Sequence, residues 1–244
     1  MQPPKLRILD LFSGIGGFSL GLERTGGFET VAFCEIEPFP RKVLAKHWPN
    51  VPVYEDVRTL TAERLAADGI GVDVICGGFP CQDISDAGHQ VGIDGERSGL
   101  WSEIARLVGE LRPRHVIVEN VSALLGRGLD QVLIDLAALG YDADWECIPA
   151  SAVGAPHPRD RIWILAYPES QQGTEVHNRV SRAFTRQLGR EIGRSRGVWA
   201  DQPAILRVVD GLPDQLDRLK ALGNAVVPQI PEMIGRAILA AEAA

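Results

Sequence analysis

The chain has 244 residues, of which 45% are hydrophobic, and this is enough to form the core of one or two domains. Its formal net charge of −7 argues against indiscriminate binding of nucleic acid but leaves room for a local basic surface. We find neither a signal-peptide pattern at the start nor an apolar run of membrane-spanning length, so we expect a soluble, cytoplasmic protein.

Apolar, β-rich runs alternate with amphipathic helix candidates along most of the chain. The expected strands cover residues 6–12, 29–35, 51–55, 72–77, 115–120, 144–150 and 161–167. The expected helices between most of them cover residues 17–26, 40–48, 60–68, 100–111 and 129–140. This alternation predicts an α/β fold with a doubly wound, mostly parallel sheet that is covered on both faces. Ligands of such sheets bind outside the carboxyl ends of the strands.

The first strand leads into a glycine-rich turn, DLFSGIGGFSLGL (10–22), which lets the backbone approach a ligand and aims free helix N–H groups at it. Taken alone, the turn is a weak signal, because a tight turn with close helix packing also explains it. The second strand ends at Glu35, which suits two ribose hydroxyls, and the third ends at Asp56, which suits an adenine amino group. Because no third glycine follows in G-x-G-x-x-G register, we expect an adenosine-containing cofactor without a pyrophosphate.

Cys81 lies in GGFPCQDIS (77–85), a few residues after the fourth strand. It is either a small buried residue or a nucleophile. The long, glycine-rich segment 82–99 is typical of a functional lid, and the next strand brings the acid Glu119 to the same sheet edge, so we favour the nucleophile. We assign Cys76 to the core. The cysteines form neither a CxxC pair nor a zinc-type cluster, and we expect no metal and no disulfide framework.

The regular alternation ends near Tyr167, and residues 168–213 are polar with little periodicity. Within them, the stretch 177–196 holds six arginines and one acid. It is either a solvated polar segment or a nucleic-acid surface, because arginine binds phosphate and guanine edges in fork geometry. Periodicity returns in 214–224 and in 230–244, where we expect a terminal helix.

Five segments occur in the order found in DNA (cytosine-5)-methyltransferases: FSGIGG (12–17), GGFPCQDIS (77–85), ENVSALL (119–125), HPRDRIWIL (157–165) and LGNAVVP (222–228). The chain resembles this family over about 1–167 and 214–235, in a short form similar to phage or prophage enzymes. The resemblance implies a catalytic and cofactor-binding domain (1–167), a short target-recognition region (168–213) and a C-terminal segment (214–244) that returns to the first domain. The chain departs from the family in three ways. Its target-recognition region is very short, only traces of one family block are found around 206–219, and His157 stands where many members have glutamine.

The cofactor that the resemblance implies is S-adenosylmethionine. Glu35 would take the ribose and Ile36 would pack on the adenine, while Asn224 and Val226 would help to close the pocket. The full set of implied cofactor contacts is Phe12, Ser13, Gly14, Ile15, Gly16, Gly17, Glu35, Ile36, Asp56, Val57, Pro80, Leu100, Asn224 and Val226.

The resemblance further implies that Cys81 adds to C6 of a flipped cytosine. Glu119 would contact N3 and the exocyclic amine, and Arg159 and Arg161 would hold the base near the thiolate. The substrate would be double-stranded DNA, bound by a monomer, with a cognate restriction endonuclease as a candidate partner. The implied DNA contacts are Gln82, Ser85, Arg179, Arg182, Arg186 and Arg190.

Two other functions stay open at this point. A related branch that methylates cytosine in RNA also uses a Pro-Cys-Gln loop, and the arginine-rich stretch does not decide between DNA and RNA. A catalytically silent regulator that binds cofactor and DNA is a third possibility, against which the joint presence of Cys81, Glu119, Arg159 and Arg161 argues.

Overall fold

The computed structural model describes residues 4–80, 98–169 and 221–243. Within them, seven strands form one sheet: β1 (Leu6–Leu11), β2 (Phe28–Cys34), β3 (Val53–Tyr54), β4 (Val74–Gly77), β5 (His115–Val121), β6 (Tyr141–Pro149) and β7 (Asp160–Pro168). The α-helices are α1 (Gly17–Glu23), α2 (Pro38–His47), α3 (Ala62–Ala67), α4 (Trp101–Leu111), α5 (Leu129–Ala138) and α8 (Gln229–Glu242). Short 3₁₀ turns are η1 (Val57–Thr59), η2 (Ser98–Leu100), η3 (Ser122–Gly126) and η4 (Ala150–Val153).

The strand order is β3-β2-β1-β4-β5-β7-β6, and the first five strands pair in parallel. The predicted α/β fold with a mostly parallel sheet is therefore confirmed. β7 is the exception, because it runs antiparallel to both β5 and β6. Only η4 and a short turn join β6 to β7, too few residues for the crossover that a parallel connection needs.

The reversal of β7 brings the start of this strand to the sheet edge where the parallel strands end. Val121, the last residue of β5, pairs with Arg161, and Glu119 pairs with Trp163. A residue at the beginning of β7 therefore lies beside residues at the end of β5. This register places the segment around Arg159 at the same edge as the carboxyl ends of the other strands.

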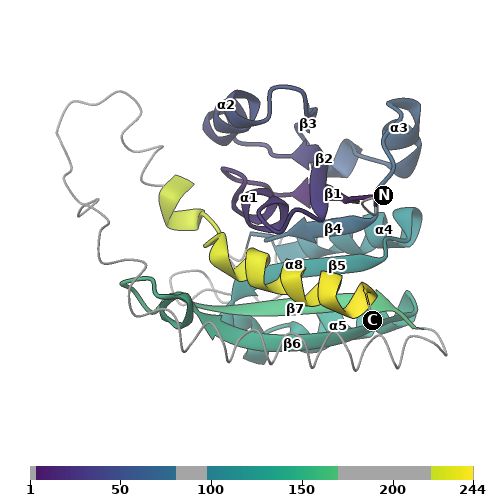
Figure 1. Ribbon diagram of the computed structural model, residues 1–244. Coiled ribbons are helices and arrows are strands. Elements are labelled where there is room, and N and C mark those ends of the chain that lie inside the picture. The colour runs from purple at the N-terminus through teal and green to yellow at the C-terminus, as the bar shows by residue number, and fades with distance from the viewer. Residues whose placement is uncertain (1–3, 81–97, 170–220, 244) are drawn as a thin grey trace.

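Helices cover both faces of the sheet (Figure 1). Buried side chains form two hydrophobic clusters, one on each face. In β1, Leu9 and Leu11 face the layer formed with α3, α4 and α5, while Leu6 and Ile8 face the layer formed with α1 and α8. Asp10 points to the same face of the sheet as Leu6 and Ile8, because residues two apart in a strand share a face. The burial of apolar side chains on both faces is what a central parallel strand requires.

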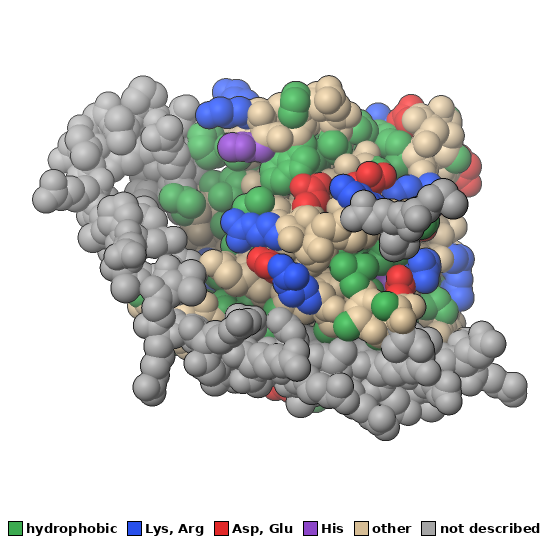
Figure 2. Space-filling view, in the orientation of Figure 1, with side chains coloured by type: hydrophobic (Ala, Val, Ile, Leu, Met, Phe, Trp, Pro, Cys, Tyr) green, Lys and Arg blue, Asp and Glu red, His purple; other side chains and the backbone are tan. Residues whose placement is uncertain are grey.

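The C-terminal helix α8 packs along α1, although more than two hundred residues separate them (Figure 1). A Cβ built on Gly21 would lie 2.2 Å from the carbonyl oxygen of Pro228, so this contact between backbones tolerates no side chain. Blue and red side chains lie next to one another in the middle of the face in Figure 2. In α8, Glu232 pairs with Arg24 of the segment after α1 and with Arg236. In the described residues, no helix is long and apolar enough to cross a bilayer.

Candidate active site

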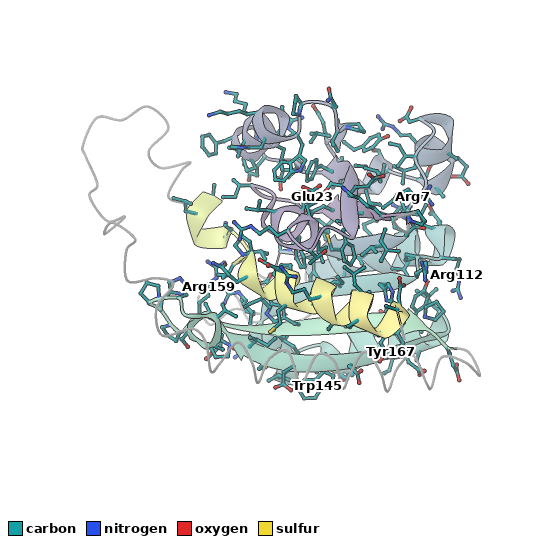
Figure 3. All side chains as sticks on the ribbon, in the orientation of Figure 1. Arg7, Glu23, Arg112, Trp145, Arg159 and Tyr167 are labelled. Carbon is teal, nitrogen blue, oxygen red and sulfur yellow. The ribbon has the colours of Figure 1, made fainter. Side chains whose placement is uncertain are left out.

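A cavity of about 340 Å³ lies at the edge of the sheet where the parallel strands end. Its walls come from the segments that follow β1, β2 and β4, from the end of β5, from the start of β7 and from residues just before α8. In Figure 3, Arg159 marks this edge, and Arg7 and Arg112 mark the opposite one. The lining residues are Phe12, Gly14, Glu35, Ile36, Glu37, Phe39, Pro40, Gly78, Phe79, Pro80, Glu119, Asn120, Val121, Arg159, Arg161, Ala221 and Asn224.

The turn between β1 and α1 is shaped by left-handed backbone conformations, with positive φ angles at Phe12, Gly14 and Gly16. A Cβ on Gly16 would lie 2.7 Å from the indole ring of Trp48, so only glycine fits there. A Cβ on Gly17 would lie 2.6 Å from the carbonyl oxygen of Val226. The turn is therefore held between the end of α2 and the segment that leads into α8, as close packing of backbone requires.

Asp10 supports the same turn from inside the sheet. The first residue of α1 has no side-chain cap, because the N-cap position is Gly16. Instead, Oδ2 of the fully buried Asp10 accepts hydrogen bonds from the Ser19 hydroxyl at 2.7 Å and the Ser19 backbone N–H at 3.3 Å. Burial raises the pKa of Asp10 to about 7, and the nearby Glu35 carboxylate adds to this effect, while the bonds from Ser19 oppose it.

Glu35 connects two walls of the cavity through its carboxylate. Oε2 accepts a hydrogen bond from the backbone N–H of Gly14 at 2.7 Å, and Oε1 accepts one from the N–H of Glu37 at 2.8 Å. The side chain is buried, whereas its neighbour Ile36 is 58% exposed and offers an apolar surface at the cavity. A carboxylate fixed by two backbone donors keeps further lone pairs for a ligand's hydroxyl groups.

Asp56 and Val57, in the loop after β3, do not line the cavity. Both oxygens of Asp56 accept hydrogen bonds from the guanidinium of Arg58, which lowers the pKa of this carboxyl. The Val57 side chain is buried. Of the predicted cofactor contacts, the cavity is lined by Phe12, Gly14, Glu35, Ile36, Pro80 and Asn224, and it is not lined by Ser13, Ile15, Gly16, Gly17, Asp56, Val57, Leu100 or Val226.

At the other end of the cavity, Glu119 pairs with Arg161, whose Nε lies 2.8 Å from Oε1 of the carboxylate. Burial raises the pKa of Glu119, while Arg161 and Arg159 act in the opposite direction. Arg159 has a positive φ of 34°, and burial together with repulsion from Arg161 lowers its pKa. A Cβ on Gly78 would lie 2.7 Å from Oε2 of Glu119, so this glycine leaves the room that the carboxylate occupies.

Asn120 is a site residue to which the sequence analysis assigned no role. It is buried, and its amide donates to the carbonyl oxygen of Phe79 at 3.3 Å while Oδ1 accepts from the Val121 N–H at 2.8 Å. These bonds tie the segment after β4 to β5 beyond the last ladder pair, Gly77 with Val118. Its position in Glu-Asn-Val, directly after Glu119, is the sequence signal that could have pointed to it.

Several predicted site residues lie outside the described residues: Cys81, Gln82, Ser85, Arg179, Arg182, Arg186 and Arg190. The same holds for residues 82–97 of the expected lid and for residues 170–213 of the expected target-recognition region. Cys76 is fully buried in the core, as predicted, and burial raises the pKa of its thiol. The described part of the chain contains no group of three or more His, Cys, Asp or Glu residues that could hold a metal ion.

A family model described as C-5 cytosine-specific DNA methylase matches residues 6–194. The chain is 36% identical over 169 residues to the type II methyltransferase M2.BsuMI of Bacillus subtilis (strain 168), covering 66% of this chain and 42% of that protein. It is 35% identical over 172 residues to M.CviJI of Paramecium bursaria Chlorella virus IL3A, covering 70% and 45%. The chain thus spans less than half the length of these two relatives.

Among solved structures, the fold is similar to a protein assigned as a DNA modification methyltransferase encoded within an E. coli prophage. The TM-score is 0.58 at 29% identity, covering 70% of this chain and 50% of that one. S. pombe Dnmt2 has a TM-score of 0.57 at 22% identity, covering 68% and 51%, and supports the fold alone.

Proposed function

The chain belongs to the C-5 cytosine-specific DNA methylase family, and on that premise we propose that it transfers a methyl group from S-adenosylmethionine to C5 of cytosine in double-stranded DNA. One observation carries this proposal. A single cavity is lined both by the glycine turn with Glu35 and by Glu119 with Arg159 and Arg161. A donor site and a reacting base would therefore share one cavity.

The residues at the end of the cavity formed by the glycine turn and Glu35 fit the cofactor. The volume of about 340 Å³ is within the usual range for small-molecule sites, and the turn at Gly14 brings backbone close to the cavity. Glu35 would accept hydrogen bonds from the ribose hydroxyls, and the exposed side chain of Ile36 would pack on the adenine. When bound, S-adenosylmethionine supplies an electrophilic methyl group.

The reactive end would activate a carbon that is otherwise a weak nucleophile. The Cys81 thiolate would add to C6 of cytosine, the C5=C6 electron pair shifts to form C4=C5, and the C4=N3 pair moves to N3, which takes a proton from Glu119. The raised pKa of Glu119 favours the protonated form that this transfer needs. C5 then bonds to the methyl carbon while the bond from that carbon to the sulfonium sulfur breaks, which leaves S-adenosylhomocysteine. The C5 proton leaves to water, the C5=C6 double bond re-forms and the C6–S bond breaks with its electron pair returning to Cys81, while Glu119 recovers the proton from N3. Thiolate and carboxylic acid are thus regenerated.

Arg159 and Arg161 would serve this chemistry through their charge. Arg161 fixes the orientation of the Glu119 carboxyl through the 2.8 Å contact. Two cations in the cavity also favour the ionised form of a neighbouring thiol, because a positive charge lowers the pKa of cysteine. Their effect on Glu119 is smaller than that of burial, since the pKa of this carboxyl is raised despite them.

A cytosine stacked in a duplex cannot enter a cavity of this kind, so the base would be flipped out at a cost of about a few kcal/mol. We further propose that the arginine-rich part of 168–213, with Arg179, Arg182, Arg186 and Arg190, contacts the DNA, and that Gln82 and Ser85 contact the flipped base. Phosphate contacts by arginine would supply much of the affinity and base contacts the specificity.

The test compares the wild-type chain with Cys81→Ser, using S-adenosylmethionine with a labelled methyl group and either duplex DNA or tRNA. We expect transfer to duplex DNA, with a loss of at least about 10³-fold in Cys81→Ser. Cys147→Ser, which changes a half-buried cysteine away from the cavity, should keep wild-type activity. Duplexes that carry 5-fluorocytosine should trap a denaturation-resistant adduct, since the ring has no C5 proton to lose.

Near-native turnover of Cys81→Ser, or the absence of any trapped adduct, would contradict the covalent mechanism. Transfer to tRNA without transfer to duplex DNA would assign the substrate to RNA instead. If duplex DNA is the substrate, bisulfite sequencing of DNA from an expressing host would give the position of the methylated cytosine and the recognition sequence.

A further inference from the structure

Arg106 of α4 has a hydrogen-bond partner for each of its three guanidinium nitrogens. Nε donates to Glu103 at 2.9 Å and Nη1 to Glu110 at 2.7 Å. Nη2 donates to the backbone carbonyl oxygens of Val57 and Leu60, each at 2.9 Å. Only a planar fork with five N–H groups can serve two carboxylates and two carbonyls at once, so the guanidinium is held in one orientation.

The charge of Arg106 is maintained although the side chain is only 31% exposed. Burial lowers its pKa, but the hydrogen bonds and charges of Glu110 and Glu103 outweigh burial and raise the pKa above the usual arginine value. The two acids lie one turn away on either side in the same helix. Arg106 is therefore a fixed cation that points from α4 toward the loop after β3.

The loop that Arg106 contacts has little other support from the sheet. β3 consists of Val53 and Tyr54 alone, and the chain then leaves the sheet for η1. Glu110 adds a second tie, because its Oε2 accepts a hydrogen bond from the backbone N–H of Ala62 at 3.0 Å. Arg106 and Glu110 of α4 thus hold the backbone at three positions, which are Val57 in η1, Leu60, and Ala62 at the start of α3.

The same loop carries Asp56 and Val57, which the family resemblance places among the cofactor contacts, although neither lines the cavity in this structure. Leu100, a further implied cofactor contact that does not line the cavity either, directly precedes α4, the helix that bears Arg106. The distance between the Asp56–Val57 loop and the segment before α4 is therefore set in part by the contacts of the Arg106 guanidinium.

We propose that Arg106 is a positioning residue for the adenine end of the cofactor site, because it holds the Asp56–Val57 loop against α4. This inference rests on the proposed function, since it concerns the binding of S-adenosylmethionine. It adds a residue that touches neither the cofactor nor the reacting base in that proposal. Its effect should appear in cofactor affinity and not in the chemical step.

The experiment measures three quantities for the full chain with Arg106→Gln. These are the Kd for S-adenosylmethionine by calorimetry, the KM and kcat for methyl transfer, and thermal unfolding without cofactor. Glutamine cannot reach two carboxylates and two carbonyls, so we expect the Kd and the KM for S-adenosylmethionine to rise about tenfold. The kcat at saturating cofactor and the KM for DNA should stay within about twofold of the wild type.

The matched control is Glu103→Gln, which removes one carboxylate next to Arg106 and leaves its bonds to the Val57 and Leu60 carbonyls in place. Its Kd for S-adenosylmethionine should stay within about twofold of the wild type. If Arg106→Gln does not fold, Arg106→Lys keeps the positive charge without the fork and should show an intermediate Kd.

A lower melting temperature of the Arg106 variants with an unchanged Kd would show a purely structural role and overturn the inference. A fall in kcat with unchanged KM would overturn it as well, since the effect would then lie in the chemical step. A wild-type chain that bound no S-adenosylmethionine at all would instead refute the proposed function, and the inference with it.

Discussion

The buried carboxyl of Asp10 should make the protein less stable as the pH rises toward neutrality. Its pKa in the folded state is raised from 3.8 to about 7, mainly by burial. Between these values the folded state holds a proton that the unfolded state has lost. The free energy of unfolding therefore falls with rising pH, by about 1.4 kcal/mol per pH unit while this difference is complete.

The expected size of the effect follows from the two pKa values. From pH 5 to pH 8, the contribution of Asp10 to the free energy of unfolding should decrease by about 2 to 3 kcal/mol. Most of the decrease falls below pH 7, and the curve levels off above the folded-state pKa, where both states are ionised. This is a large part of a total stability that is about 5 to 15 kcal/mol in ordinary proteins.

The assay is urea unfolding of the wild type and Asp10→Asn at pH 5, 6, 7 and 8. Asparagine keeps an oxygen that accepts from Ser19 but cannot ionise, so the variant should lack the decline. The control Asp130→Asn changes an exposed carboxylate in the first turn of α5 and should keep the decline. A constant difference in unfolding free energy between the wild type and Asp10→Asn across this range would refute the reasoning, because Asp10 would then not titrate in it.

Two further predictions concern the cavity. Glu35→Gln leaves one of two backbone N–H groups, those of Gly14 and Glu37, without its acceptor. The Kd for S-adenosylmethionine should rise at least about tenfold, and calorimetry that showed no change would contradict the assignment of this carboxylate. Gly78→Ala would place a Cβ 2.7 Å from Oε2 of Glu119 and displace the carboxyl. The kcat should fall about 100-fold, since small misplacements of catalytic groups have effects of this order, and an unchanged kcat would argue against a role of Glu119 in the reaction.

The fold was largely predictable because most strands are apolar runs bounded by turn residues. The start of β6 was missed, and the strand begins at Tyr141 instead of residue 144. β6 is an edge strand with the acids Asp142, Asp144 and Glu146, so the beginning of the strand is polar in sequence. The direction of β7 was not predictable from a local pattern either, since an apolar run has the same composition in both directions.

The place of a candidate residue at the cavity was predictable where it depends on position in a strand, and not where it depends on distant contacts. Glu35 and Glu119 follow apolar runs, and topology alone brings such residues to one sheet edge. Asn120 and Arg106, in contrast, bond to backbone carbonyls 41 and 49 residues away in sequence, at Phe79 and Val57. A side-chain bond to a carbonyl leaves no mark on the sequence of its partner, because every residue has a carbonyl.

The antiparallel pairing of β5 with β7 also determines the sign of the charge beside Glu119. Successive residues of a strand point to opposite faces, so a shift of the pairing by a single residue would exchange Arg161 for Asp160 or Ile162 opposite Val121. The carboxyl of Glu119 would then face an anion or a hydrocarbon where it now meets a guanidinium. An insertion or deletion in the short connection between β6 and β7 that shifted this pairing would therefore change the charge beside Glu119, even though it replaced no side chain of the cavity.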